Sequence, residues 1–260
     1  MSGPWLVRIG KPAARHPSLR LLGLPHAGGG PSLFRPWATA LPPDVDLVAA
    51  QLPGRERRLA ETPCRDAKTI VTGLVAAVLA LPPAPLVLYG HSLGASLALD
   101  LAVALTEAQA PLALVTVAAR AAPYLPPRRP PLSPLDDRAF LTAIGAMGGT
   151  PREALEHAEL MAMVLPVLRA DFVLSEGFAR PPAPVIACPL LAVNGRDDPY
   201  VTEADMRAWS AFAAGRFRFE EVAAGHFFAQ SHRNDILRLI FEEIGWTSSA
   251  SATDLCQEAS

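Results

Sequence analysis

Short apolar runs alternate along the chain with longer segments of helical composition. Short apolar runs bounded by turn residues are typical of buried strands, and apolar residues at helical spacing are typical of helices. This alternation predicts an α/β fold with a mostly parallel central sheet and helices on both faces. The predicted strands cover residues 19–24, 45–50, 85–89, 112–118, 189–193 and 217–222, and the predicted helices lie near residues 33–41, 67–81, 95–105 and 235–244.

The alternation is interrupted between residues 121 and 183. A proline-rich segment, 126–131, opens the interruption and a second one, 180–184, closes it. Two or three helices are expected between them. One of these begins at residues 150–153 with an N-cap threonine, a proline at the first helical position and a glutamate three residues after the cap. Pro166 is expected to kink or split the helix that follows.

The helices of this insertion carry more apolar residues than one buried stripe requires. Two interpretations are open. The insertion is a lid that offers an apolar wall to a substrate, with Met161 and Leu165 among the contacts, or its apolar residues are ordinary helical core.

Composition restricts the class of protein. The chain has 260 residues, half of them hydrophobic, which is enough for one large domain, expected over residues 1–246 and followed by a Ser/Ala-rich tail over 247–260. A net charge of −2 gives no reason to expect nucleic acid or a membrane surface as partner. The three cysteines show no metal-ligand spacing, and no metal or cofactor is predicted. Neither a signal peptide nor a membrane span is visible, so we expect a soluble, cytoplasmic monomer.

The segment from Val87 to Ala95 carries the strongest chemical signal. It joins a short apolar run to a Gly-x-Ser-x-Gly pattern, Gly90 to Gly94, and then to a stretch of helical composition. This order is typical of a nucleophile elbow, in which a sharp turn in a strained backbone conformation exposes a serine hydroxyl. The glycines avoid collisions across the turn. The pattern predicts Ser92 as a nucleophile rather than as a serine in a flexible turn.

A nucleophilic serine needs a base and an orienting carboxylate, expected in the order Ser, acid, His after late strands. His226 follows the strand predicted at 217–222 and precedes the last helix, where a catalytic imidazole is expected. The acid is Asp197 or Asp198, both after the strand predicted at 189–193, and Pro199 favours Asp198 because it stiffens the turn. His91 lies inside the elbow, but its side chain is expected to point away from the serine.

The Gly-rich segment after the first predicted strand, Leu24 to Gly30, has two interpretations. A phosphate-binding loop is disfavoured, since no Lys-Ser/Thr pair follows it. An oxyanion hole fits better: one N–H comes from the residue after the nucleophile, Leu93, and a second from the loop after an early strand, assigned to Ala27.

Six motifs together resemble the type II thioesterases, the discrete α/β-hydrolases that accompany polyketide and nonribosomal peptide synthases. They are Pro25 to Gly29, Gln51 to Glu56, Gly90 to Ala95, Gly148 to Pro151, Leu165 to Phe172 and Gly225 to Phe228. The resemblance extends from about residue 21 to residue 244 and maps the triad to Ser92, Asp198 and His226. It departs from the family at Leu93, where the family usually has Met. Arg169 to Asp171 is interpreted as a structural ion-pair element and Gly54 to Glu56 as a loop-ordering element.

The resemblance implies hydrolysis of acyl thioesters on the phosphopantetheine arm of acyl- or peptidyl-carrier proteins, which clears aberrant or stalled acyl groups from the synthase. Phe227, beside the predicted catalytic histidine, is a further expected substrate contact. The alternatives are a chain-terminating fatty-acyl thioesterase, a general carboxylesterase, or a non-catalytic binding module; the intact Ser/Asp/His set argues against the last. Arg55, Arg57, Arg58 and the pair Arg128-Arg129 are either contacts to an acidic carrier or solvated surface.

Overall fold

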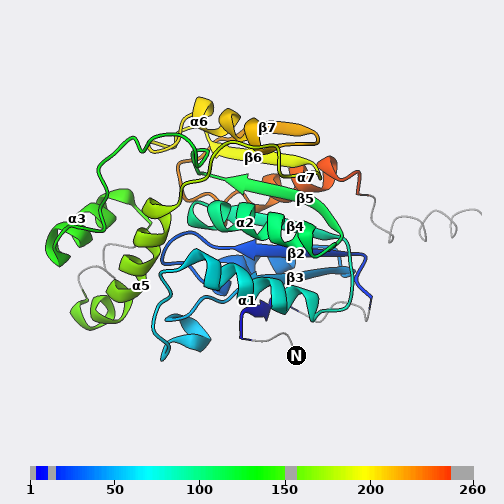
Figure 1. The fold of residues 1–260 in the computed structure, drawn as a ribbon. Helices are drawn as coiled ribbons and strands as arrows, with labels where there is room; N and C mark the ends of the chain where they lie inside the picture. Colours follow the sequence, from blue (N-terminus) through cyan, green and yellow to red (C-terminus); the bar gives the residue numbers. More distant parts are fainter. Residues whose placement is uncertain (1–3, 11–15, 150–156, 247–260) are drawn as a thin grey trace, which may run out of the picture.

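The computed structural model describes residues 4–10, 16–149 and 157–246. The described chain forms one seven-stranded sheet in the order β1-β3-β2-β4-β5-β6-β7 (Figure 1). β1 pairs with β3 in antiparallel orientation, and every other neighbouring pair is parallel. The strands are β1 (Leu6–Arg8), β2 (Leu19–Leu24), β3 (Val45–Ala50), β4 (Leu86–His91), β5 (Leu112–Ala118), β6 (Leu190–Gly195) and β7 (Phe217–Val222).

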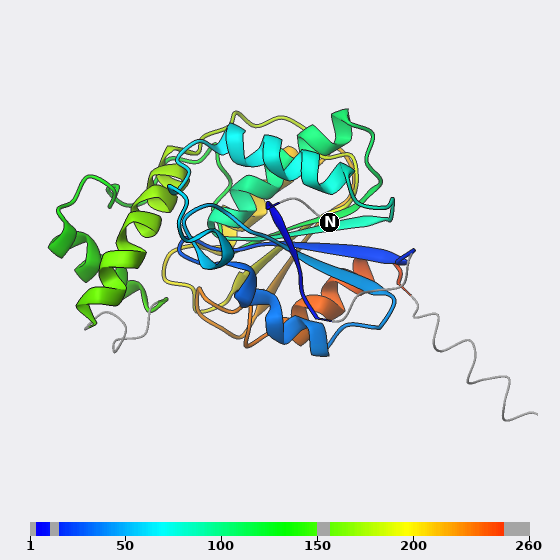
Figure 2. The same ribbon diagram turned by 90° about the horizontal axis from the view of Figure 1, so that it is seen from below.

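Two apolar layers enclose this sheet, as parallel strands buried on both faces require. One core cluster packs α1, α2, α6 and η3 against one face, and the other packs η1 and α7 against the opposite face (Figure 2). The helices and 3-10 helices of these layers are α1 (Ala67–Leu79), α2 (Leu93–Glu107), α6 (Glu203–Arg207), α7 (Arg233–Glu243), η1 (Pro31–Thr39) and η3 (Ala208–Phe212).

The predicted mostly parallel α/β fold is confirmed, and four of the six predicted strands have the expected bounds. Four elements differ from the prediction. β1 has three residues and lies at the sheet edge, which is too short to give an apolar run. The segment predicted as a helix near 33–41 is the 3-10 helix η1, which contains Pro36, a residue with no N–H for a helical hydrogen bond. α6 and η3 were not predicted.

The described helices of the insertion (residues 121–183) lie beyond the carboxyl ends of the parallel strands (Figure 1). They are α3 (Asp137–Met147) and α5 (Ala158–Gly177). Of the two outcomes predicted for Pro166, a kink or a split, the split is wrong, since α5 continues through it. Pro166 and Ala162 are both exposed, so water can satisfy the carbonyl that loses its helical partner. The helix start predicted at residues 150–153 and the tail predicted from residue 247 lie outside the described residues.

The strand order also fixes where a site can form. β2 and β4 are neighbours, and the chain proceeds outwards from them in opposite directions, through β3 on one side and β5 on the other. Ligands of open α/β sheets bind at the carboxyl end of such a switch point. The Gly-rich loop follows β2 and the Gly-x-Ser-x-Gly segment follows β4, so both motifs meet there. Among the described residues, no helix has the length and hydropathy of a membrane span.

Candidate active site

Ser92 stands at the turn between β4 and α2 in a strained conformation, with φ of 53° and ψ of −113°. A non-glycine residue in this region is held there by its surroundings. The Ser92 N–H donates to the carbonyl of Ala118 at the end of β5, over 2.8 Å. The neighbouring strand therefore fixes the turn that presents the serine hydroxyl.

The two flanking glycines are required by close approaches of backbone. A Cβ on Gly90 would lie 2.2 Å from the carbonyl oxygen of Gly94, and a Cβ on Gly94 would lie 2.2 Å from that of Leu24. The first contact is the expected collision across the turn. The second contact is with another segment: Gly94 faces the end of β2, and its lack of a side chain allows the elbow to pack against the start of the Gly-rich loop.

The structure brings Ser92, His226 and Asp198 into one hydrogen-bonded line. His226 Nδ1 lies 2.7 Å from Asp198 Oδ2, and His226 Nε2 lies 3.3 Å from Ser92 Oγ. A carboxylate can only accept, so Nδ1 carries the proton and the Nε2 lone pair faces the serine hydroxyl. This arrangement suits a base that takes the serine proton.

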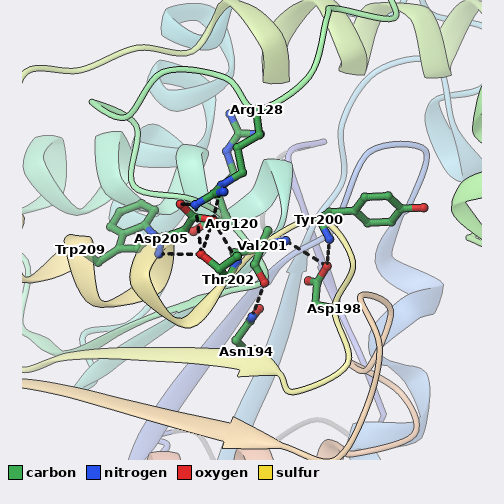
Figure 3. Close-up of polar contacts among 9 residues, drawn as sticks. All are labelled: Arg120, Arg128, Asn194, Asp198, Tyr200, Val201, Thr202, Asp205 and Trp209. Atoms are coloured by element: carbon green, nitrogen blue, oxygen red, sulfur yellow. Dashed lines mark hydrogen bonds and ion pairs between the residues drawn. The ribbon is translucent and has the colours of Figure 1, made fainter.

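The geometry also distinguishes the two adjacent aspartates. The Asp198 side chain is fully buried, and its Oδ1 accepts from the N–H groups of Tyr200 (2.8 Å) and Val201 (3.2 Å). Asn194 holds the same turn from β6, because its Nδ2 donates to the Val201 carbonyl over 2.8 Å (Figure 3). Asp197 is exposed. Only Asp198 is placed to orient the imidazole.

His91 points away from Ser92, as expected, and supports His226 from behind. Its Nε2 lies 2.8 Å from the His226 carbonyl oxygen and its Nδ1 lies 3.0 Å from the Tyr89 hydroxyl. The carbonyl can only accept, so Nε2 carries the proton and Nδ1 accepts from Tyr89. Burial lowers the pKa of His91 well below its ordinary value, and the nearby His226 and His26 lower it further. The neutral form matches this chain of hydrogen bonds.

Another imidazole, the half-buried His26, lies in the Gly-rich loop. Its Nδ1 donates to the Ala27 carbonyl over 2.9 Å, and burial lowers its pKa as well. The N–H groups of Ala27 and Leu93 donate to no acceptor within the described residues. Leu93 directly follows Ser92, and Ala27 lines the same cavity as Ser92. Both N–H groups are thus the candidate donors to an oxyanion.

Lowering the pH from 7 to 5 is expected to reduce the free energy of unfolding. His26 and His91 have lowered pKa values in the folded chain, so the unfolded chain takes up protons below about pH 6.5 that the folded chain does not. Their contribution is complete above that pH and decreases below it, by at most about 1.4 kcal/mol per pH unit for each imidazole. Urea unfolding at several pH values measures the slope. His91→Gln should make it shallower, and an unchanged slope in this variant would contradict the assignment.

A cavity of about 420 Å³ opens over Ser92 and His226. Ala27 lines it as well, and the insertion contributes the apolar side chains of Leu168 and Phe172. Pockets of this size and lining are typical of small-molecule sites. Within the described part of the chain, no group of three His, Cys, Asp or Glu side chains is arranged as metal ligands would be.

Of the three predicted substrate contacts, only Phe227 is on the cavity wall. Its ring packs edge-on against His226 at 4.9 Å and against His26 at 5.2 Å between ring centroids. Met161 and Leu165 are not on the wall. They lie nearer the start of α5, and Leu168 and Phe172, one to two turns further along, face the cavity instead.

The sequence analysis missed Tyr200 and Asn194. Tyr200 lines the cavity, packs edge-on against His226 at 5.4 Å and lies under the Arg129 guanidinium at 4.1 Å. Asn194 had a usable signal, since an amide at the end of a buried strand needs a specific partner. For Tyr200 the sequence held no such signal beyond its position after Pro199.

The arginines suggested as carrier contacts have different environments. Arg55 is buried, which excludes it from a docking surface. Arg128 pairs with Asp205 over 2.8 Å while remaining half exposed, and both lie beside the Asp198 turn (Figure 3). Arg58 stacks on Trp5, with 4.3 Å from the guanidinium carbon to the ring centroid.

Comparison with known proteins decides the family. The family model described as the thioesterase domain matches residues 20–244. The chain belongs to the thioesterase family. This thioesterase is 34% identical over 246 residues to the thioesterase PikA5 of Streptomyces venezuelae, covering 94% of this chain and 86% of the relative.

Solved structures agree with this assignment. BorB, the type II thioesterase from the borrelidin biosynthetic cluster, has a TM-score of 0.84 at 35% identity, covering 94% of this thioesterase and 99% of BorB. RedJ, the thioesterase from the prodiginine pathway in Streptomyces coelicolor, has a TM-score of 0.80 at 31% identity, covering 90% and 89%. The chain is thus a type II thioesterase with the α/β-hydrolase fold, and the predicted resemblance is confirmed.

Proposed function

We propose that this thioesterase hydrolyses acyl groups held on the phosphopantetheine arm of acyl- or peptidyl-carrier proteins, and so clears stalled or aberrant groups from a polyketide or nonribosomal peptide synthase. The observation that carries the proposal is the Ser92–His226–Asp198 hydrogen-bonded line, whose serine and histidine line a mostly apolar cavity. The similarity to thioesterases of biosynthetic pathways, such as BorB and RedJ, supports the proposed role beside a synthase.

In the acylation step, His226 Nε2 takes the proton of Ser92 as Oγ attacks the thioester carbonyl carbon. The N–H groups of Ala27 and Leu93 stabilise the negative oxygen of the tetrahedral intermediate. Asp198 holds the imidazole in the required tautomer and stabilises its protonated form. The C–S bond then breaks, the leaving sulfur receives the proton from His226, and the acyl group remains on Ser92.

In the deacylation step, His226 takes a proton from water, whose oxygen attacks the acyl carbon. The ester bond to Ser92 breaks, His226 returns the proton to Oγ, and the carboxylic acid leaves. The insertion acts as a lid: Leu168 and Phe172 form an apolar wall that shields the ester from the surrounding water.

The test is hydrolysis of acetyl, propionyl and longer acyl groups from a phosphopantetheinylated carrier protein. The same acyl groups on a small thiol and as simple esters are measured alongside. We expect the highest kcat/KM on the carrier. Preference for long fatty-acyl carriers would indicate a chain-terminating thioesterase, and equal or faster hydrolysis of simple esters would indicate a general carboxylesterase.

A further inference from the structure

A buried ion pair connects helix α5 of the insertion to the segment between β3 and α1. Asp171, on α5, is fully buried, and Arg55 precedes η2 (Glu56–Arg58) and is 7% exposed. The guanidinium binds the carboxylate with both arms, Nη1 to Oδ2 over 2.6 Å and Nη2 to Oδ1 over 2.8 Å. Ion pairs that are removed from water and bonded in this two-pronged way are geometrically specific.

The same pair also holds the Gly-rich loop. Gly28 N–H donates to Asp171 Oδ2 over 2.7 Å, and Arg55 Nη1 donates to the Gly29 carbonyl over 3.0 Å. Gly28 has a φ of +78°, and a Cβ there would lie 2.7 Å from Leu168 on α5. One helix of the insertion therefore supplies both a polar and an apolar contact to the residue next to Ala27.

These contacts fix both peptide groups that flank Ala27. In the peptide between Ala27 and Gly28, His26 Nδ1 holds the carbonyl and Asp171 holds the N–H. In the peptide between His26 and Ala27, the carbonyl accepts from Gly29 N–H over 2.9 Å, which leaves the Ala27 N–H as its free donor within the described residues. The direction of that N–H depends on the conformation of the turn, and Asp171 is the hydrogen-bonding residue of the insertion that holds the turn.

We propose that Asp171 is a positioning residue that makes the oxyanion hole dependent on the docked place of α5. With α5 in its observed place, Asp171 holds the turn that aims Ala27 N–H, and Leu168 and Phe172 close the cavity wall at the same time. The oxyanion hole is therefore complete only when α5 is docked and its apolar side chains form the cavity wall. The inference rests on the roles proposed above for Ser92, Ala27 and Leu93.

If the Arg55–Asp171 pair were purely structural, its loss would lower the stability of the fold but leave the ratio of transition-state to ground-state binding unchanged. If Asp171 positions the oxyanion hole, its loss should weaken transition-state binding selectively. The two roles are separated by two unreactive acyl-pantetheine analogues. In the first, a trifluoromethyl ketone replaces the thioester: Ser92 Oγ adds to its carbonyl carbon, and the resulting alkoxide occupies the oxyanion hole. In the second, a thioether with CH₂ in place of the carbonyl binds without forming an oxyanion.

In Asp171→Asn the amide nitrogen replaces one carboxylate oxygen and so faces a donor, either of Arg55 alone or of Gly28 and Arg55 together. We therefore expect the kcat of this variant to fall by about 10- to 100-fold, less than for the complete loss of an oxyanion donor. Its affinity for the trifluoromethyl ketone should fall by the same factor, while KM and the affinity for the thioether stay within twofold of wild type. Asp137→Asn is the matched control, because Asp137 also pairs with an arginine of the insertion, Arg169, over 2.6 Å and does not contact the loop. Its kinetic constants should match those of wild type.

A second variant guards against the case in which Asp171→Asn fails to fold because it leaves the buried Arg55 charge without its partner. The double replacement Arg55→Met with Asp171→Leu removes both buried charges, a change that proteins often tolerate, and still removes the acceptor of Gly28 N–H. It should show the same selective loss of affinity for the ketone.

Equal affinities of wild type and both variants for the ketone would overturn the role of Asp171, as would equal losses for ketone and thioether. Failure of wild type to form the ketone adduct would instead overturn the proposed roles of Ser92 and the oxyanion donors.

Discussion

Replacing Ser92 with alanine is expected to reduce kcat for acyl release from a carrier protein by about 10⁴- to 10⁶-fold, the range for loss of a triad nucleophile. The fold should persist, because alanine keeps the Cβ and the N–H that bonds to Ala118. Single-turnover discharge of an acylated carrier measures the rate, and thermal unfolding measures stability.

Ser96→Ala is the matched control. Ser96 lies one turn further along α2, is fully buried, and its Oγ has no hydrogen-bond partner within the described residues. Its replacement should leave kcat within twofold of wild type. Substantial turnover by Ser92→Ala would remove Ser92 from the mechanism.

Asp198→Asn is expected to lower kcat by about 10⁴-fold, as at the corresponding position of serine hydrolase triads. Its amide group can donate to His226 Nδ1, which favours the tautomer with the proton on Nε2 and deprives Ser92 of its base. The turn should survive, because the remaining side-chain oxygen can still accept from Tyr200 and Val201. The pH-dependence of kcat/KM and the circular dichroism of the variant separate loss of the base from loss of the fold.

The neighbouring aspartate provides the control on the same turn. Asp197 is exposed, and the Asp197→Asn variant should retain kcat within twofold of wild type. If Asp197→Asn were the inactive variant of the two, the geometric assignment of the acid would be wrong.

The sequence predicted the fold and the chain positions of the triad because these depend on local patterns. A buried parallel strand is rich in apolar residues, and the expected bounds of β2, β3 and β5 match the structure. β7 also has the expected bounds, although it lies at the sheet edge and only Val222 in it is buried. The elbow has a chemical pattern of its own, since only glycine fits at Gly90 and Gly94. His226 and the Asp197-Asp198 pair were found because strands β6 and β7 precede them.

The insertion was predicted less well, because helical composition does not say which face of a helix meets a cavity. Met161 and Leu165 have the same apolar character as Leu168, yet only Leu168 lies on the cavity wall. The rotation and depth of α5 are set by partners far away in the sequence: Arg55 holds Asp171, and Arg120 donates to the hydroxyl and carbonyl of Ser175 over 2.7 and 2.6 Å. No periodicity within residues 158–177 encodes these contacts.

The amino-acid sequence by itself determined the mostly parallel sheet, the strained turn at Ser92 and the order of nucleophile, acid and base, because apolar runs and glycine sterics are local. Only the tertiary structure decided that Asp198 and not Asp197 faces His226, that His91 holds the His226 carbonyl, and that Asp171 holds the loop beside Ala27. Each of these depends on the direction of a side chain across a distance of 28 to 143 residues, and that direction is fixed by packing between elements.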